Sequence, residues 1–185
     1  MGGCPAIIKL QQGAQGIGTM IAETPQAVTS LLETLWAMGQ DIILQEYIGE
    51  SKGRDLRAIV VGGRVVAAMR RQARGDEFRS NLHRGGEGVR IKLDKRYTQT
   101  AIMASKIMGL EVAGVDMLEG RSGPKILEIN SSPGLEGIER TSGVDVAGII
   151  IEHAERYAKT KKKRARRADP VLEQERRGSR LRQLA

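Results

Sequence analysis

The sequence predicts an α+β fold with largely antiparallel sheets. Two pairs of apolar runs are each joined by a short turn that contains glycine, which is typical of β-hairpins: Leu56–Val61 with Arg64–Met69, and Val112–Leu118 with Lys125–Ile129. Helical segments separate these hairpins instead of alternating with single strands. Antiparallel pairing is therefore favoured over a parallel sheet with helical crossovers.

The N-terminal segment begins with a short apolar run. Ala6–Leu10 is expected to be a buried strand, and it leads into a glycine-rich turn, Gly13–Gly18. Ile17–Ala22 is then expected to return as a second strand.

A helix is expected after this pair of strands. Thr24 suits the N-cap and Pro25 the first helical position, and apolar residues recur at helical spacing until Gly39. Ile42–Ile48 follows as another predicted buried strand.

The rest of the chain combines hairpins, one long loop and two helices. Residues 74–88 are charged and glycine-rich, which predicts a long loop. Asp94 suits the N-cap of a helix that runs to about Met108. A last helix is expected from about Val144 to Ala158.

Composition excludes several classes of protein. Hydrophobic residues make up 40% and charged residues 28%, as in ordinary globular proteins, and no apolar run approaches the ~20 residues of a membrane span. The N-terminus has no signal-peptide pattern, and a single cysteine, Cys4, excludes an internal disulfide and a multi-cysteine zinc site. With only 3% aromatic residues, base stacking is not expected. We expect a cytoplasmic protein with no membrane contact.

The positive charge is concentrated at the C-terminus. Arg156–Ala185 contains 12 lysines and arginines against 3 acidic residues, a charge of +9, so the remainder of the chain carries about −1. Residues 160–185 are expected to be a basic, disordered tail. The tail would hold ribosomal RNA by counterion release, or else serve as a solubilising end or linker.

Three oxygen-bearing residues form a candidate metal site. Glu128 and Asn130 are two apart in a predicted strand and so share one face, with Asp116 on the hairpin partner. Such hard oxygen ligands suit Mg²⁺ or Mn²⁺, which complete their shells with substrate phosphates. Ile126 is expected on the same face and Leu127 on the opposite one. The alternative is a set of solvent-facing polar positions on a half-buried sheet.

The glycine-rich turn is a candidate phosphate site. Backbone amides of Gly13–Gly18 can approach a phosphate closely, and Lys9 is a charge within an apolar strand that a phosphate would explain. The alternatives are an ordinary hairpin loop and a lysine that extends to the surface. The turn fits neither a Walker loop nor a dinucleotide-binding turn.

Arginines gather around the long loop. Their number favours bidentate recognition of anions, although a solvated charged loop explains them equally well. The basic residues around Asn81 are Arg70, Arg71, Arg74, Arg79, His83 and Arg84.

Taken in order, these motifs resemble the ATP-grasp ligases, and within them the RimK-like α-L-glutamate ligases. The resemblance covers about Cys4 to Tyr157. It rests on Lys9, Gly13–Gly18, Gln45–Ile48, Asp55–Arg57, Phe78–Gly86, Val115–Asp116, Leu127–Asn130 and the continuation to Glu139.

The resemblance implies an ATP-grasp fold in which two α+β lobes hold ATP between them. It implies lobes at residues 1–70 and 71–159. Family members carry an N-terminal domain before the strand that holds Lys9, so we expect that domain to be missing from this chain.

The resemblance also implies the reaction and the residues that carry it. A carboxylate is phosphorylated by ATP and the acyl-phosphate is attacked by an amine, with two Mg²⁺ or Mn²⁺ ions bound. Ser131, Pro133 and Gly134 shape the acceptor side. The implied nucleotide-binding residues are Lys9, Gly13, Gln15, Gly16, Gly18, Glu46, Tyr47, Asp55, Arg79 and Asn81; the implied catalytic residues are Arg71, Arg79 and Asn81; the implied metal ligands are Asp116, Glu128 and Asn130.

The implied substrates are ATP, glutamate and an acidic protein C-terminus, that of the sixth small-subunit ribosomal protein. A homo-oligomer is also expected. Two alternatives remain open: a non-catalytic fragment that binds ATP or the ribosome, and a related ligase that acts on a small cofactor or an amino-group carrier protein.

Overall fold

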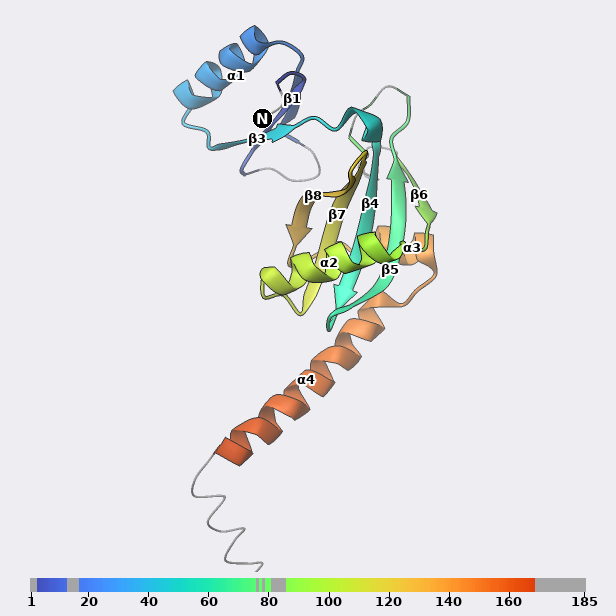
Figure 1. The fold of residues 1–185 in the computed structure, drawn as a ribbon. Helices are drawn as coiled ribbons and strands as arrows, with labels where there is room; N and C mark the ends of the chain where they lie inside the picture. The colour runs from blue at the N-terminus through green and yellow to red at the C-terminus, as the bar shows by residue number, and fades with distance from the viewer. Residues whose placement is uncertain (1–2, 13–16, 76, 78, 81–85, 169–185) are drawn as a thin grey trace, which may run out of the picture. The chain divides into compact units, whose positions relative to one another are not determined.

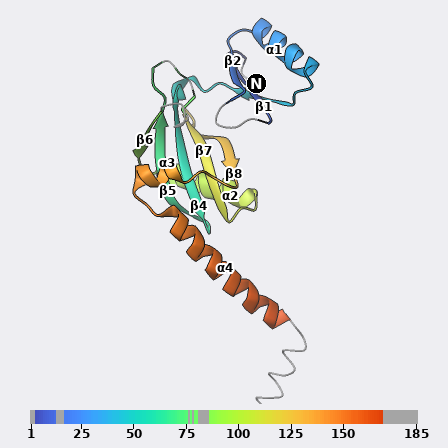
Figure 2. The ribbon, with the colours of Figure 1, turned by 180° about the vertical axis from the view of Figure 1, so that it is seen from behind.

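The computed structural model describes residues 3–12, 17–75, 77, 79–80 and 86–168 of the 185-residue chain. The chain divides into two compact units, Met1–Val144 and Asp145–Ala185. The described part of the first unit contains two antiparallel sheets with their helices (Figures 1 and 2). The predicted α+β class with antiparallel sheets is therefore confirmed.

The smaller sheet has the strand order β2-β1-β3, with β1 at Ala6–Leu10, β2 at Thr19–Ala22 and β3 at Ile42–Glu46. Both β2 and β3 are shorter than predicted, because the chain turns at residues 17–18 and leaves the sheet after Glu46. The helix between them, α1 (Pro25–Ala37), begins as predicted: the Thr24 side chain accepts a hydrogen bond from the Ala27 amide at 3.2 Å.

The larger sheet has the strand order β6-β5-β4-β7-β8 and follows a short 3₁₀ turn, η1 (Gly49–Ser51). Its β6 lies at the end of the predicted loop and escaped prediction, since four residues at a sheet edge show no apolar alternation. The strand bounds are β4 Arg54–Val61, β5 Arg64–Gln72, β6 Glu87–Arg90, β7 Val112–Gly120 and β8 Gly123–Asn130.

Two helices pack on opposite faces of the larger sheet (Figures 1 and 2). One is α2 (Lys95–Ile107), which Asp94 caps by accepting from the Tyr97 amide at 2.9 Å. It covers the main hydrophobic core, which consists of Leu56, Ala58, Val60, Ala101, Ala104, Ala113, Val115 and Met117. The other, α3 (Glu136–Ser142), contacts β5 and β6 and buries Ile138.

Residues on β4 and β7 alternate between the α2 face and the α3 face. Every second residue, such as Ala58 and Val115, enters the core, and the residues between them face the other way. The polar side chains of Asp55, Arg57 and Asp116 occupy that second face. This alternation places a row of charges on one side of a sheet whose other side is apolar.

The second unit contains α4 (Val146–Ala168). It extends ten residues beyond the predicted end at Ala158, so the first part of the basic segment is helical. Lysine, arginine and alanine favour helix, and the i,i+4 pairs Glu152–Arg156 and Glu155–Lys159 add modest support. None of the helices in the described ranges combines the length and apolarity that a membrane crossing requires.

Gly114 on β7 is expected to tolerate no side chain. A Cβ atom there would lie 2.7 Å from the Cβ of Pro133, part of a rigid ring. We expect Gly114→Ala to lower the free energy of unfolding by about 1–3 kcal/mol. Gly134→Ala is the control, since its Cβ would meet nothing within 4 Å. Urea denaturation checks this, and equal effects of the two substitutions would contradict it.

Candidate functional site

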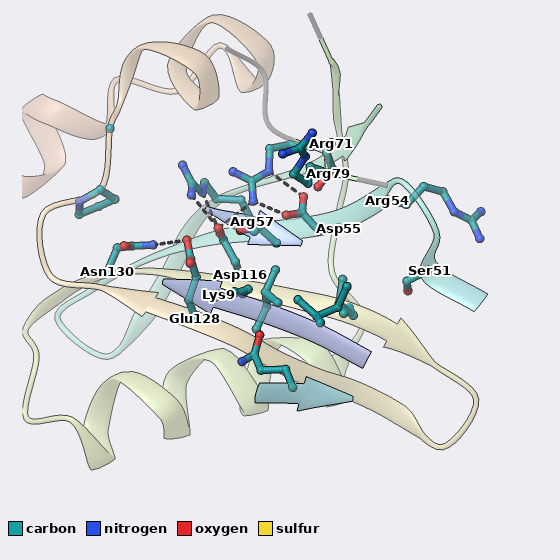
Figure 3. A pocket seen from close by; sticks show the side chains of 18 of the residues that line it. Lys9, Ser51, Arg54, Asp55, Arg57, Arg71, Arg79, Asp116, Glu128 and Asn130 are labelled. Carbon is teal, nitrogen blue, oxygen red and sulfur yellow. Dashed lines mark hydrogen bonds and ion pairs between the residues drawn. The ribbon is translucent and has the colours of Figure 1, made fainter. Parts of the chain in front are cut away.

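Residues from both sheets of the first unit line one cavity of about 890 Å³ (Figure 3). The smaller sheet contributes Lys9 and the strand β3, and the larger sheet contributes its polar face. The segment after β8 forms a further part of the lining, from Ser132 to Arg140. Motifs that are more than 100 residues apart in the sequence therefore meet around one space.

Four charged side chains form a hydrogen-bonded chain on the polar face of the larger sheet, in the order Asp55–Arg71–Asp116–Arg57 (Figure 3). Arg57 donates from Nε and Nη2 to the two oxygens of Asp116, at 2.8 and 2.7 Å. Arg71 donates from Nη2 to Asp116 at 2.7 Å and from Nε to Asp55 at 2.6 Å, with a further bond from Nη2 to Asp55.

The register of the sheet builds this chain. Asp55 on β4 lies directly opposite Arg71 on β5, and Arg57 lies directly opposite Asp116 on β7. Directly opposed side chains on one face of an antiparallel pair lie close enough to interact. Asp116 in turn lies opposite Glu128 on β8, so the same row continues to the far edge of the sheet.

Three of the four members are almost completely buried, with exposed fractions of 2% for Asp55, 5% for Arg71 and 1% for Asp116. Burial alone raises the pKa of Asp116, but the hydrogen bond from Arg57 and the charges of Arg71 and Arg57 outweigh it and hold that pKa below its ordinary value. Burial raises the pKa of Asp55, and the hydrogen bond and charge of Arg71 offset this rise only in part. Two carboxylates and two guanidinium groups leave this set of four side chains without net charge, as burial requires.

The three candidate metal ligands lie together on this face. Asp116 is the cross-strand partner of Glu128, and the Asn130 amide donates to Glu128 Oε1 at 3.1 Å. A carboxylate offers about four acceptor positions, and Asp116 uses three of them for arginine N–H groups, so one remains for a cation. The oxygen set fits a hard divalent cation.

The set is small. Among the described residues no group of three or more His, Cys, Asp or Glu side chains is placed to hold a metal. The candidate site therefore consists of two carboxylates and one amide oxygen, and oxygens of a phosphate or of water would have to complete the shell.

Lys9 reaches this cluster from the smaller sheet (Figure 3). Burial lowers its pKa, while the negative charges of Glu128 and Asp116 act in the opposite direction. The ammonium group therefore lies within electrostatic range of both carboxylates. A phosphate bound between them would contact a cation on one side and metal ligands on the other.

The predicted nucleotide-binding residues Glu46 and Tyr47 line the same cavity, together with their neighbours Gln45 and Ile48. The side-chain oxygen of Gln45 is buried and accepts no hydrogen bond in the described part of the chain. An unsatisfied buried acceptor is unfavourable, so a ligand with an N–H group would be stabilised here.

Arg79 also lines the cavity, and Glu77 holds it. Its amide, Nε and Nη2 donate to the Glu77 carboxylate at 3.1, 2.9 and 2.8 Å, and these hydrogen bonds raise the pKa of Arg79. Gly18 has a φ of +78° and lies between lining residues Ile17 and Thr19.

Four predicted site residues lie outside the described residues: Gly13, Gln15, Gly16 and Asn81.

Arg57 and Ser80 were missed as site residues. Arg57 belongs to the Asp55-Leu56-Arg57 motif, but its pairing with Asp116 depends on a strand register that the sequence does not state. Ser80 is buried and hydrogen-bonds Asp55.

The face assigned to Ile126 was wrong. A register shift follows Asp116, so Ile126 lies opposite Met117 of the core, and Leu127 joins Glu128 in the cavity lining.

We compared the sequence with known protein families. Residues 2–154 match the RimK-like ATP-grasp domain. This chain belongs to the RimK-like ATP-grasp family. The match extends over the whole cavity lining, so every described residue of the site lies inside the family domain.

Curated relatives of this RimK-like chain carry the name probable α-L-glutamate ligase. One from Picosynechococcus is 56% identical over 158 residues, covering 85% of this chain and 52% of the relative. Another, from Rhodopirellula baltica, is 54% identical over 153 residues, covering 83% of this chain and 38% of the relative. The chain thus spans about half the length of the curated relatives it matches, or less.

Solved structures support the ATP-grasp fold. The ligase PsnB, in complex with a phosphomimetic precursor variant, Mg and ADP, has a TM-score of 0.61 at 25% identity, covering 80% of this chain and 44% of that one. A D-alanine–D-alanine ligase from Bacillus anthracis has a TM-score of 0.63 at 20% identity, covering 85% of this chain and 56% of that one. The predicted ATP-grasp fold is confirmed.

Arg71 is expected to be the most sensitive residue for stability. Arg71→Gln would leave two buried carboxylates short of their shared partner, and breaking a buried ion pair in this way costs about 3–5 kcal/mol. The neighbouring Arg70 pairs with Glu119 at 3.0 Å but is 43% exposed, so Arg70→Gln should cost less than about 1 kcal/mol. Urea denaturation of both variants checks this, and similar losses would contradict it.

Asp116 should make stability depend on pH at the acid end. Because its pKa is lowered by folding, the ionised carboxylate stabilises the fold at neutral pH, and this contribution is lost as the pH falls through the folded pKa. The advantage of the parent chain over Asp116→Asn should therefore stay constant above about pH 5 and shrink as the pH falls below that value toward the lowered folded pKa. Denaturation in a chelating buffer measures it, and a constant difference would refute the assignment.

Proposed function

We propose that this chain is the ATP-binding and amide-forming part of an α-L-glutamate ligase. One observation carries the proposal: Lys9, Asp116, Glu128 and Asn130, from two different sheets, line one cavity in a chain of the RimK-like family. The names of the curated relatives support the choice of glutamate as a substrate.

The proposed reaction has two steps. A substrate carboxylate attacks the γ-phosphorus of ATP, which forms an acyl-phosphate and releases ADP. The amine of glutamate then attacks the acyl carbon, the C–O bond to phosphate breaks, and the amine loses a proton to give an amide. Two anions must approach one another in the first step, so electrostatic stabilisation is the main task of the site.

We assign the nucleotide to the side of the cavity formed by β3 and β1. Backbone groups at Glu46 and Tyr47 would bind the adenine edge, and the Gln45 oxygen supplies an acceptor for an N–H donor. Lys9 would contact the phosphates, with the turn that ends at Gly18 covering them. The complexes of PsnB with Mg and ADP and of the Bacillus anthracis ligase with ATP support ATP as the nucleotide.

Asp116, Glu128 and Asn130 would hold Mg²⁺, or Mn²⁺ in its place, as two ions. When bound, the metal neutralises phosphate charge and orients the transferred phosphoryl group. The chain's own part is to keep the ligands in place: Arg57 and Arg71 hold Asp116 in one orientation, and Asn130 orients Glu128.

Three further residues have proposed roles at the reacting groups. Arg71 uses Nε and Nη2 for the two aspartates, while its Nη1 makes no hydrogen bond within the described residues, so those N–H groups are free for the acyl-phosphate. Arg79 would leave Glu77 to bind an anion, and we assign Asn81 to the same task. Asp55 would contact the nucleotide from its place next to Arg71.

The finer assignments are also proposals. The carboxyl substrate would be the C-terminus of the sixth small-subunit ribosomal protein, with the basic segment after residue 160 contacting ribosomal RNA. Division into lobes at residues 1–70 and 71–159 stays a prediction; the larger sheet takes β4 from before this boundary and β7 from after it. Acceptors such as a small cofactor or an amino-group carrier protein are alternatives.

A coupled assay tests the function. The chain is incubated with ATP, Mg²⁺, glutamate and a peptide that ends in glutamates, and ADP release and peptide mass are followed together. We expect mass increments of one glutamyl residue matched by ADP. Nucleotide binding without ADP release or a mass change would instead indicate a nucleotide-binding part that does not ligate by itself.

Glu128→Ala and Asn130→Ala should each weaken Mg²⁺-dependent binding of ADP by about tenfold or more, since each removes a metal ligand. Calorimetry with and without Mg²⁺ separates this loss from binding of the nucleotide alone, which should persist. Glu136→Ala is a control for removal of a carboxylate from the same cavity lining. Unchanged Mg²⁺ dependence in both ligand variants would refute the metal assignment.

A further inference from the structure

The cavity has a wall that the nucleotide and metal assignments do not use. It follows directly after the proposed metal ligand Asn130 and continues into α3. Among the described residues of this wall, Arg140 is the only basic one and Glu136 the only acidic one. The wall consists of Ser132, Pro133, Gly134, Leu135, Glu136, Gly137 and Arg140.

Arg140 differs from the other arginines of the cavity in how weakly it is held. Arg57 and Arg71 are fixed on buried carboxylates, Arg79 makes three hydrogen bonds to Glu77, and Arg54 donates to the Glu50 carbonyl at 2.8 Å. Among the described residues Arg140 pairs with Glu136 alone, at 3.9 Å, and the two side chains are 73% and 86% exposed. Such a pair contributes little, so the guanidinium can move to a ligand at small cost.

The position of α3 makes this arginine usable. Ile138 and Ser142 are buried and anchor the helix, and the Ser142 hydroxyl donates to the Ile138 carbonyl at 2.6 Å. Glu136, Gly137 and Arg140 lie on the cavity side of the same short helix. The backbone is thus held in place, while the arginine side chain is exposed and weakly paired in the lining of the cavity.

We propose that Arg140 binds a carboxylate of the acidic substrate that does not itself react. The inference rests on the proposed function. A glutamate that reacts through its amine, or a terminal glutamyl residue that reacts through one carboxylate, still carries a carboxylate that takes no part in the reaction. A guanidinium binds such a group through two parallel hydrogen bonds. The carboxylate belongs either to free glutamate or to the glutamate end of a peptide, and both present the same chemistry.

Binding measurements test this without requiring turnover. L-glutamate and a tri-glutamate peptide are titrated separately into the chain with ADP and Mg²⁺, and again without them. For the ligand that uses the subsite, Arg140→Gln should weaken binding by about tenfold, the loss expected for one charge-assisted pair. Arg140→Lys should recover part of it. L-glutamine amide, or a tri-glutamine peptide with an amidated C-terminus, carries no carboxylate and should bind the parent and Arg140→Gln equally.

Arg74→Gln is the matched control. Arg74 is also 73% exposed and pairs with a single exposed glutamate, Glu87, but it does not line the cavity. Its substitution removes the same charge and should leave binding unchanged. Glu136→Gln should act in the opposite direction and tighten binding of the acidic ligand, because it frees Arg140 and removes a like charge from the wall.

The outcomes separate the two claims. If Arg140→Gln and Arg74→Gln weaken binding equally, or if neither acidic ligand binds the parent, the subsite is wrong. If ADP binds with Mg²⁺ but the acidic ligands bind the parent and Arg140→Gln with equal affinity, the inference fails and the proposed function stands. If the parent chain does not bind ADP with Mg²⁺, the proposed function is overturned. Binding of glutamate that depends on Arg140 but needs no nucleotide would still support the subsite.

Discussion

The site depends on the buried ion-pair chain Asp55–Arg71–Asp116–Arg57. Burying four charged groups is unfavourable unless each is paired with good geometry, and here the cross-strand register of β4, β5 and β7 supplies that geometry. The same contacts that neutralise the charges also fix the orientation of Asp116. A carboxylate held by two arginines cannot rotate to another position, so the acceptor position that remains available points in one direction.

The chain of ion pairs also explains how a sheet can be apolar on one face and charged on the other. Strand alternation sends Ala58 and Val115 into the core beneath α2 and sends Arg57 and Asp116 into the cavity. The core determines where the strands lie, and the strands determine where the charges lie. Packing and electrostatics are therefore coupled through the backbone, and residues such as Gly114, against Pro133, matter to both.

Elements with strong local signals were predicted well. The Thr24 and Asp94 caps, the two hairpins and the helices between them follow from neighbouring residues, and the structure confirms them. Elements without such signals were not: β6 is short and lies at an edge, and α4 continues because lysine and arginine favour helix as readily as they favour solvent. The register shift after Asp116 reversed the faces of Ile126 and Leu127, since local alternation cannot reveal an extra residue in one strand.

The sequence by itself determined the fold class, the caps, the candidate ligands Asp116, Glu128 and Asn130, and the family resemblance, because each depends on residues close together or on motifs in order. Only the tertiary structure decided which charges meet. That Arg57 holds Asp116, that Arg71 joins two aspartates, and that Arg140 lines the same cavity as both all depend on strand register and on packing between distant segments. Such contacts span 45 residues or more in several cases, and no local pattern encodes them.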